Sequence, residues 1–360
     1  MRKSFDILEV AEKLGIKILR RASFEEYIAR CPFCGDSENP EHGHLYLNIS
    51  KSVYYCVRCG KGGNTVNLYA ELKNLDEKEA YKELKEGNIT SLAVKEGLKK
   101  IQHNSVAPIE VRDRVYRAFL EKLTLEPRHL RNLLRRGLSW EETAKNLYKS
   151  LPEEPQQRWR ICRELINEGY SLKGIPGFYQ REKDGKRYWD FVDYKGFLIP
   201  VKDAQGRIQG FQIRLDEEEK GRKYVWFSSR DKLNGTPAHA WQGVHAWQGV
   251  HGEPSKVVFI TEGPLKADVA HYLSRLTFIS VPGVTAIKGI EVVLQEVKAK
   301  KVYIAYDMDL LTNPAVQKAK ERLEEKLKNA GFEVRTKTWD RRYKGIDDYL
   351  LFQTKQRKIV

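Results

Sequence analysis

Two pairs of cysteines constrain the fold of this chain more than any other feature. Cys31 and Cys34 form one C-x-x-C pair, Cys56 and Cys59 form a second, and 21 residues separate the two pairs. This spacing can place four thiolates at the corners of a tetrahedron around one Zn²⁺, and four thiolates with no open position indicate a structural site. A glycine follows each pair, so the backbone can turn tightly enough for its N–H groups to face the sulfurs. The sequence therefore predicts a zinc site with four cysteine ligands.

The segment between the two cysteine pairs predicts the rest of this module. Residues 44–49 and 52–55 have the composition of two strands joined by a short turn, which completes a zinc ribbon. His42 and His44 are alternative ligands, but four cysteines already complete the site, so we favour solvated loop histidines. Before the ribbon, residues 4–19 follow a helical period.

Length and composition limit the classes of protein to be considered. A chain of 360 residues has room for two or three domains. No apolar run is long enough for a transmembrane helix, and the N-terminus lacks the pattern of a signal peptide, so we expect no membrane partner. Four of the five cysteines have metal-site spacing, which fits a reducing cytoplasm, and Cys162 is interpreted as a buried helical thiol.

The charge of the chain points to a polyanionic partner. Its 64 Lys and Arg against 49 Asp and Glu give a formal net charge of +15. Basic side chains that contact phosphates release condensed counterions, which favours nucleic-acid binding. A solvated basic surface is the alternative interpretation of the same charge.

The middle of the chain changes from helical to strand patterns. Residues 71–103 are rich in Glu and Lys and predict short helices and a hinged linker. Helical patterns follow from about 110 to 168, with a capping-box spacing at Ser139. Strand patterns follow from about 186 to 230, and residues 196–214 predict a β-hairpin with its turn at 203–206.

A hexapeptide, HAWQGV, occurs twice in succession over residues 239–250. Two copies are too few for a repeat architecture, so we interpret them as a local duplication that lengthened a loop or hairpin. The duplication also spaces His239, His245 and His251 six residues apart. A second metal site there is the alternative, although no carboxylate or thiol supports it.

From residue 256 onward, strand and helix patterns alternate. The predicted strands are 257–261, 278–281, 301–306 and 332–338, and the predicted helices are 264–276, 291–298 and 314–330. This alternation is typical of a mainly parallel sheet covered by helices.

Acidic residues lie just beyond the ends of these strands. Glu262 follows the first strand, Asp307 and Asp309 follow the third, and Asp347 and Asp348 are placed in the loop after the last. Ligands of open parallel sheets bind at the carboxyl ends of the strands, and clustered carboxylates select Mg²⁺ or Mn²⁺. The alternative is that the Asp-x-Asp pair only caps the following helix, but an asparagine before that helix already fits the role.

These acidic segments resemble a known family. Residues 261–263, 306–309 and 345–348 look like the three acidic motifs of a Toprim domain. The order of zinc ribbon, mixed region and Toprim domain is that of bacterial-type DnaG primases, in which the first ribbon pair is commonly Cys-x-x-His. The segment around the 196–214 hairpin is similar to the basic subdomain that precedes Toprim in that family.

The resemblance implies a multi-domain α/β protein. Its expected parts are a helix plus four-cysteine zinc ribbon (1–70), a charged helical linker (71–105), a basic α+β primase-core subdomain (106–255) and a Toprim domain with a mainly parallel sheet (256–360).

The chain also departs from the family. Two arginines that often precede the 196–201 strand are absent, and only Lys195 stands between Tyr194 and Gly196. The Asp-x-Asp is not followed by the usual Ala-Gly, and residues 262–268 look more like Toprim proteins of phages and mobile elements. The chain ends soon after the last acids, so we expect no helicase-binding region of its own, and any replicative helicase would be a separate partner.

The function implied is a DNA-dependent RNA primase that copies single-stranded DNA with NTPs by two-metal nucleotidyl transfer. A Toprim nuclease and a non-catalytic, single-stranded nucleic-acid-binding relative are the alternatives. The expected catalytic residues are Glu262, Asp307 and Asp309. The expected Mg²⁺ or Mn²⁺ ligands are Asp307, Asp309, Asp347 and Asp348. The expected nucleic-acid or nucleotide contacts are Lys195, Arg207, Arg214, Lys223 and Lys266.

Overall fold

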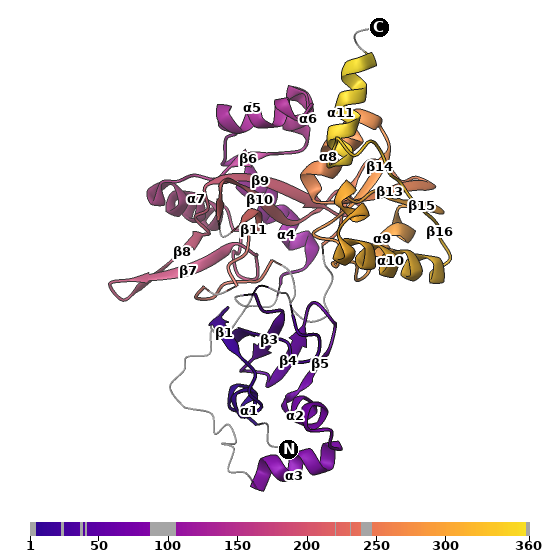
Figure 1. The fold of residues 1–360 in the computed structure, drawn as a ribbon. Helices are drawn as coiled ribbons and strands as arrows, with labels where there is room; N and C mark the ends of the chain where they lie inside the picture. The colour runs from indigo at the N-terminus through magenta and orange to yellow at the C-terminus, as the bar shows by residue number, and fades with distance from the viewer. Residues whose placement is uncertain are drawn as a thin grey trace. The chain divides into compact units, whose positions relative to one another are not determined.

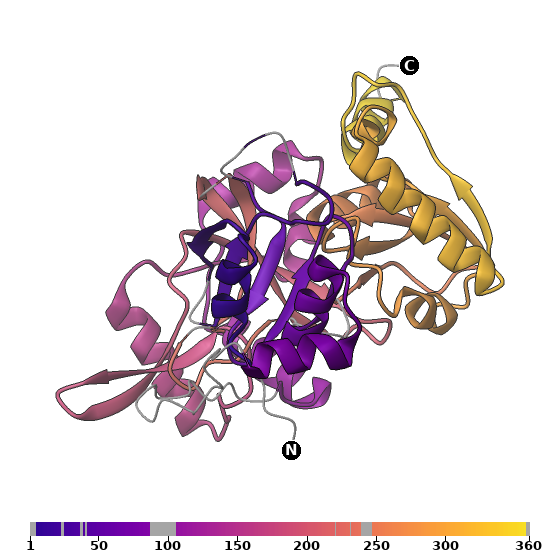
Figure 2. The ribbon, with the colours of Figure 1, turned by 60° about the horizontal axis from the view of Figure 1, so that its bottom comes forward.

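The computed structural model describes residues 5–22, 25–36, 39, 42–86, 106–219, 221–230, 232–238 and 247–357. The chain divides into two compact units, Met1–Lys100 and Ile101–Val360, and each is described by itself. Figures 1 and 2 show the elements of both units from two directions. No helix in the described ranges is long and apolar enough to cross a membrane.

The N-terminal unit is a five-stranded antiparallel sheet with three helices. Its elements are α1 (Ile7–Lys13), β1 (Ile18–Arg21), β2 (Glu26–Ala29), β3 (Leu45–Asn48), β4 (Val53–Cys56), β5 (Gly62–Asn64), α2 (Thr65–Lys73) and α3 (Glu77–Glu86). The strands are hydrogen-bonded in chain order from β1 to β5. Strands β3 and β4 confirm the two strands predicted between the cysteine pairs.

The predicted helix over residues 4–19 is too long. Helix α1 begins after Asp6, whose carboxylate accepts a hydrogen bond of 2.8 Å from the Leu8 N–H, and ends at Lys13. Ile18 instead begins strand β1 and pairs with Ala29. The apolar residues that follow the helix continue the helical period of the sequence because they pack on the core of the ribbon, where Ile16 is buried. Packing, and not continued helix, explains the second half of the pattern.

Residues at the start of the predicted linker pack into the N-terminal unit. Helix α3 lies against α2, and Ala80 and Leu84 are buried beside Tyr69. The rest of the predicted linker, residues 87–105, lies outside the described residues.

The first half of the second unit combines four helices with a twisted antiparallel sheet. The helices are α4 (Ile109–Glu121), α5 (Pro127–Arg135), α6 (Trp140–Lys145) and α7 (Pro155–Asn167). The sheet has the order β11-β10-β9-β6, with β6 (Lys149–Ser150), β9 (Gly196–Lys202), β10 (Ile208–Glu219) and β11 (Arg222–Trp226). Ser139 caps α6 as predicted, by accepting from the Glu142 N–H at 3.2 Å. Cys162 is buried in α7, also as predicted.

Strands β9 and β10 confirm the predicted hairpin, since Arg214 pairs with Phe197. A second hairpin precedes it, formed by β7 (Phe178–Lys183) and β8 (Lys186–Phe191). The strand prediction began only at about residue 186 and so missed β7. A cluster of aromatic rings around Phe119 forms the core between α4 and these strands, in contact with Phe178, Phe191, Phe211 and Phe227.

The second half of this unit is the predicted α/β region. Its elements are β12 (Gly249–His251), β13 (Val257–Glu262), α8 (Pro264–Ser274), β14 (Thr277–Val281), α9 (Ile290–Glu296), β15 (Lys301–Ile304), a 3₁₀ turn η1 (Met308–Leu311), α10 (Pro314–Asn329), β16 (Glu333–Thr336) and α11 (Ile346–Arg357). The sheet order is β12-β14-β13-β15-β16, parallel except for β12. The mainly parallel sheet is therefore confirmed.

Side chains alternate across this sheet and bring helices to both faces. Val258 and Ile260 pack with residues of α9 and α10. Phe259, between them, packs on the opposite face with residues of α8 and α11. Burial on both faces explains why β13 reads as a continuous apolar run.

Strand β12 contains the end of the duplicated hexapeptide. The first copy, together with His245 and Ala246, lies outside the described residues, and so do two of the three histidines of the alternative metal site. The third, His251, is buried and lies 2.7 Å from Asp268 and 2.9 Å from Ser280. Trp247 forms a cation–π contact with Arg112 and an edge contact with Trp226.

The contacts of His251 have the connectivity of a Ser–His–Asp hydrolase triad. However, Ser280, His251 and Asp268 are only 2%, 6% and 8% exposed, so a substrate has no access to the serine. The Tyr148 hydroxyl donates to the same Asp268. This polar chain joins the two halves of the second unit.

Candidate functional site: a cysteine cluster and an acidic sheet edge

The four cysteines predicted to bind zinc lie together. Their Sγ atoms are all within 4.8 Å of one another, with 3.8 Å between Cys31 and Cys59 and 3.9 Å between Cys34 and Cys56. A tetrahedral Zn²⁺ with Zn–S bonds of about 2.3 Å requires sulfurs about 3.8 Å apart. The four sulfurs therefore lie close to the arrangement of a structural zinc site, and two of the pairs match its spacing.

The backbone around the cysteines supports a thiolate site. Gly35 and Gly60 have φ of 66° and 77°, the left-handed turn expected after each pair. Burial raises the pKa of Cys31, and the backbone N–H groups of Phe33 and Cys34, which face its sulfur, oppose that rise. The predicted role of the two glycines matches this geometry.

Asp36 and His44 support the cluster, and sequence reasoning missed this role. The Cys31 N–H donates to Asp36 at 2.5 Å, and His44 Nδ1 contacts the other carboxylate oxygen. Burial acts to raise the pKa of Asp36, but the bonds from Cys31 and His44 lower it below its usual value. His44 is thus a partner of Asp36 and not simply a solvated loop residue. An aspartate directly after the first pair and its glycine was the available signal.

The predicted acids meet at the carboxyl edge of the parallel sheet. Glu262 ends β13, and Asp307 follows the neighbouring strand β15, with which β13 is paired up to Ile260 and Ile304. Asp309 lies two residues further on, in η1. The structure brings all three predicted catalytic carboxylates to one edge.

Asp347 and Asp348 lie in the first turn of helix α11, and not in a loop as predicted. The Met308 N–H donates to the Lys344 carbonyl at 2.9 Å, which holds the start of this helix beside η1. A Cβ on Gly345 would lie 2.3 Å from the Asp347 carboxylate, so a side chain at this position would displace that carboxylate. Acids at a helix N-terminus are favoured by the helix dipole, which the sequence pattern alone did not reveal.

Basic side chains lie among these acids. Lys266, on the first turn of α8, pairs with Asp307. Arg136 Nη1 lies 3.7 Å from Asp347, and Lys344 Nζ lies 3.9 Å from Asp309. Lys266 was predicted as a nucleotide contact, whereas no site role was predicted for Arg136 or Lys344.

The acidic edge shifts the pKa values of its members. Burial raises the pKa of Glu262, and the charges of Asp307 and Asp309 raise it further. Burial also raises the pKa of Asp347, to about 6. For Lys266, burial acts to lower the pKa, but the charges of Asp307 and Asp347 outweigh it and raise the pKa.

The acidic edge suits a divalent cation but is less closely assembled than the cysteine cluster. Asp309 Oδ1 and Asp347 Oδ1 are buried and have no hydrogen-bond partner, and buried anionic oxygens of this kind are suitable ligands for a hard cation. Among the described residues, only one group of three or more His, Cys, Asp or Glu side chains has its ligand atoms within 4.8 Å of one another. That group is the four cysteines. The acids share an edge without that spacing.

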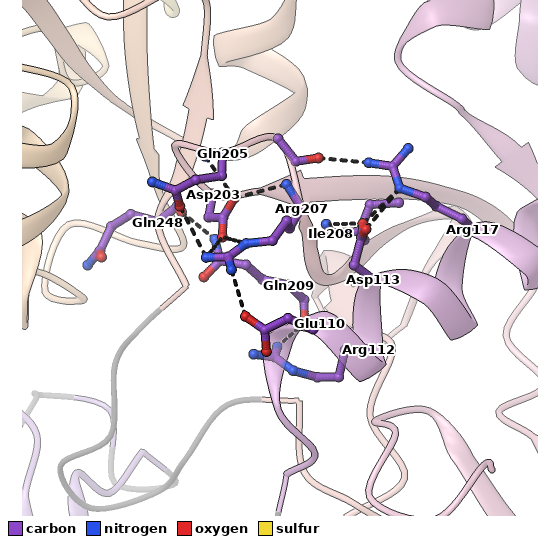
Figure 3. A network of polar contacts seen from close by, with 11 residues as sticks. Glu110, Arg112, Asp113, Arg117, Asp203, Gln205, Arg207, Ile208, Gln209 and Gln248 are labelled. Carbon is purple, nitrogen blue, oxygen red and sulfur yellow. Dashed lines mark hydrogen bonds and ion pairs between the residues drawn. The ribbon is translucent and has the colours of Figure 1, made fainter. Parts of the chain in front are cut away.

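Arg207, a predicted nucleic-acid contact, is held inside a network of polar contacts (Figure 3). Its guanidinium bonds Asp203 at 2.8 Å and Glu110 at 2.7 Å. Asp113, on α4, accepts from the Ile208 N–H at 2.8 Å. These contacts fasten the turn between β9 and β10 onto α4.

The other predicted nucleic-acid residues are spread over the first half of the unit. Lys195 pairs with Glu153, and Lys223 pairs with Glu218, each at 3.0 Å and each with its side chain largely exposed. Arg214, on β10, donates to the Leu215 carbonyl at 3.4 Å, and its buried Nε has no partner. Their role in binding stays a prediction.

Comparisons with known proteins agree with the ribbon and with the overall fold. Residues 1–100 match the family described as CHC2 zinc finger. Residues 246–357 match a family described as a domain of unknown function, DUF3854. The DNA primase of Helicobacter pylori (strain J99) is 24% identical over 332 residues, which cover 90% of this chain and 55% of that protein. The DNA primase of Staphylococcus epidermidis is 25% identical over 61% of this chain and 37% of that protein.

The fold has a match among solved structures. The crystal structure of Aquifex aeolicus primase, comprising its zinc-binding and RNA polymerase domains, aligns with a TM-score of 0.53 and 19% identity. The alignment covers 99% of this chain and 82% of that one. The chain thus spans about half the length of the Helicobacter relative and most of the Aquifex structure. The chain is therefore similar to DNA primases along most of its length, and it carries an N-terminal zinc ribbon.

Proposed function

We propose that this chain is a DNA-dependent RNA primase that synthesises short primers on single-stranded DNA. The observation that carries the proposal is the acidic sheet edge, where Glu262, Asp307 and Asp309 meet. Support comes from the similarity to DNA primases over 90% of the chain. The α/β half would be the Toprim domain that the acidic motifs resemble.

In this proposal, a nucleotide 3′-hydroxyl attacks the α-phosphate of an incoming NTP, and pyrophosphate leaves. Mg²⁺ or Mn²⁺ ions held by Asp307, Asp309, Asp347 and Asp348 would neutralise the charge that develops on the phosphate and on the leaving oxygen. The buried, unpartnered oxygens of Asp309 and Asp347 support this assignment. Glu262 would accept the proton of the attacking hydroxyl or, as a further cation ligand, would leave that proton to a water molecule.

Lys266 and Arg136 would assist at the same edge. Lys266 compensates the charge of Asp307. When cations take over that task, its ammonium becomes available to a triphosphate oxygen, which would make it the predicted nucleotide contact. Arg136 would keep Asp347 in place.

The remaining parts would serve the template. We propose that the ribbon (1–70) contacts single-stranded DNA and helps to set where synthesis starts. The linker (71–105), whose helix α3 packs into the N-terminal unit, would connect it to the basic subdomain (106–255). The Toprim domain (256–360), whose sheet also contains β12, would follow. A replicative helicase would be a further partner, as the resemblance implies.

The direct test is primer synthesis by the purified full chain. The protein is incubated with single-stranded DNA templates, labelled NTPs or dNTPs, and Mg²⁺ or Mn²⁺. We expect short RNA products that the Asp309→Ala variant reduces by at least about 100-fold, because charge compensation at the reacting phosphate is lost. Asp340→Ala is the matched control, since Asp340 is exposed, pairs with Arg342 and is not one of the acids of the sheet edge.

Other results would replace the proposal. Template degradation that depends on Asp309 would favour a Toprim nuclease. Tight template binding with neither products nor degradation, under all four pairings of nucleotide and metal, would favour a non-catalytic binding relative.

A further inference from the structure

A groove lies in the second unit between helix α7 and the hairpin of β7 and β8. Both views show this hairpin extending from the rest of its unit with α7 nearby (Figures 1 and 2). The groove has a volume of about 500 Å³. Its lining residues are Gln156, Trp159, Arg160, Cys162, Arg163, Ile166, Lys183, Arg187, Tyr188 and Trp189. Neither the predicted site residues nor the acidic edge includes any of them.

Three aromatic side chains form part of the groove wall. Trp159 and Tyr188 are in edge contact, with ring centroids 5.1 Å apart. All three rings, Trp189 included, are partly exposed. A partly exposed aromatic face can accept a nucleobase by stacking, and this contact tolerates any base.

The carboxylate of Asp190 fixes the position of the Trp159 ring. Its indole N–H donates to this carboxylate at 3.3 Å. Asp190 is fully buried and also accepts from Arg158 at 3.2 Å and from Arg181 at 2.6 Å. The ring is thus held before any ligand arrives, which lowers the entropic cost of binding.

The charge of the lining has one sign. Arg160, Arg163, Lys183 and Arg187 are exposed, and no acid is among the lining residues. Arg160 and Arg187 have acidic neighbours, Glu164 at 3.8 Å and Glu182 at 3.2 Å. Both are exposed surface pairs, which contribute little energy and exchange readily for a phosphate.

We propose that this groove binds single-stranded DNA, with bases against its aromatic rings and phosphates against its arginines. Single strands fit better than a duplex, because paired bases are not free to stack on side chains. The inference relies on the proposed function for the identity of its ligand. It assigns a template contact to α7 and the β7–β8 hairpin, in place of the turn where Arg207 is already bound.

The test measures binding without synthesis. The full chain is titrated against a fluorescently labelled oligo-dT, and anisotropy gives the dissociation constant at several salt concentrations. We expect the variant Arg160→Glu/Arg163→Glu to bind at least about 10-fold more weakly, with a salt dependence reduced by about 0.7 per lost phosphate contact. Tyr188→Ala should weaken binding about 5-fold or more and leave the salt dependence unchanged, because stacking releases no counterions.

The matched control is Lys318→Glu/Arg322→Glu, which makes the same charge change on the exposed face of α10. Thermal melts verify that each variant is folded. Wild-type affinity in the groove variants, or an equal loss in groove and control variants, would overturn the inference. Retained DNA affinity together with lost binding of an acidic peptide would also overturn it, in favour of a protein ligand.

Primer synthesis by the same preparations separates the two proposals. Groove-dependent DNA binding by a protein that makes no primers would leave the inference standing and remove the proposed function. If the wild-type protein makes primers and the groove variants bind DNA normally, the proposed function stands and the groove inference is removed.

Discussion

The two candidate metal sites differ in how completely the polypeptide assembles them. The four cysteine sulfurs already lie within 4.8 Å of one another, close to the spacing that zinc requires. The acids share a sheet edge, yet Asp307 forms an ion pair with Lys266. The carboxylate oxygens are also not as close to one another as the ligands of one metal ion would be. Thiols can pack together when protonated, whereas carboxylates at neutral pH repel unless a cation lies between them. Preformed spacing is typical of a structural site, whereas separated acids fit the proposed function, in which cations would bind together with a substrate.

The largest expected effect is at the cysteine cluster. Cys56→Ser should abolish zinc binding, because it removes one of the four ligands. An intact structural site binds zinc with about 10 kcal/mol or more of free energy, so this is the largest loss that we expect. Metal analysis should find about one zinc per wild-type chain and none in the variant. Cys162→Ser is the control, because Cys162 is buried in α7 and is not one of the four clustered cysteines. Zinc retained at full occupancy in Cys56→Ser would break the four-cysteine assignment.

A smaller effect is expected at the acidic edge. Lys266→Met leaves Asp307 and its acidic neighbours uncompensated, so we expect a loss of about 2–4 kcal/mol in the free energy of unfolding in EDTA. Mg²⁺ should then stabilise the variant more than it stabilises the wild type, because the cation replaces the lost charge.

Denaturant unfolding with and without Mg²⁺ measures both effects. Lys344→Met is the matched control, since the Lys344 side chain is largely exposed and its ammonium comes no closer than 3.9 Å to the Asp309 carboxylate. Equal Mg²⁺ stabilisation of Lys266→Met and the wild type would mean that the acids do not bind the cation together.

The smallest expected effect concerns the support of the cysteine cluster. His44→Ala removes a partner of Asp36, which holds the Cys31 N–H, and changes to such supporting groups typically reduce metal affinity about 10- to 100-fold. Competition with a zinc chelator measures this shift. His42→Ala is the control, because no described contact joins His42 to Asp36. An unchanged affinity in His44→Ala would show that the backbone alone positions Cys31.

Sequence reasoning succeeded where local spacing carries the information. The cysteine spacing predicted the zinc cluster, and the alternation of apolar runs after residue 256 predicted the strands whose ends present Glu262 and Asp307. Both signals lie within short stretches of chain and depend on periods that the backbone imposes.

It failed where a residue's role depends on a distant partner. Arg207 looks like a free basic residue on a hairpin, but Glu110, far away in the sequence, binds it. Arg136 joins Asp347 in the same way. The groove beside α7 was missed because it needs a helix and a hairpin to meet. No local pattern encodes such encounters.

The duplicated hexapeptide has a consequence for how this chain tolerates changes in length. Residues 239–245 and 245–251 have the same sequence, HAWQGVH, so removing either set of six residues yields one and the same protein. That shorter protein still contains the tryptophan that contacts Arg112, the β12 strand and the histidine that contacts Asp268. The described contacts of this segment therefore use only sequence that both copies contain. Deleting six residues at this point leaves the sequence behind every described contact in place, because either copy can supply it.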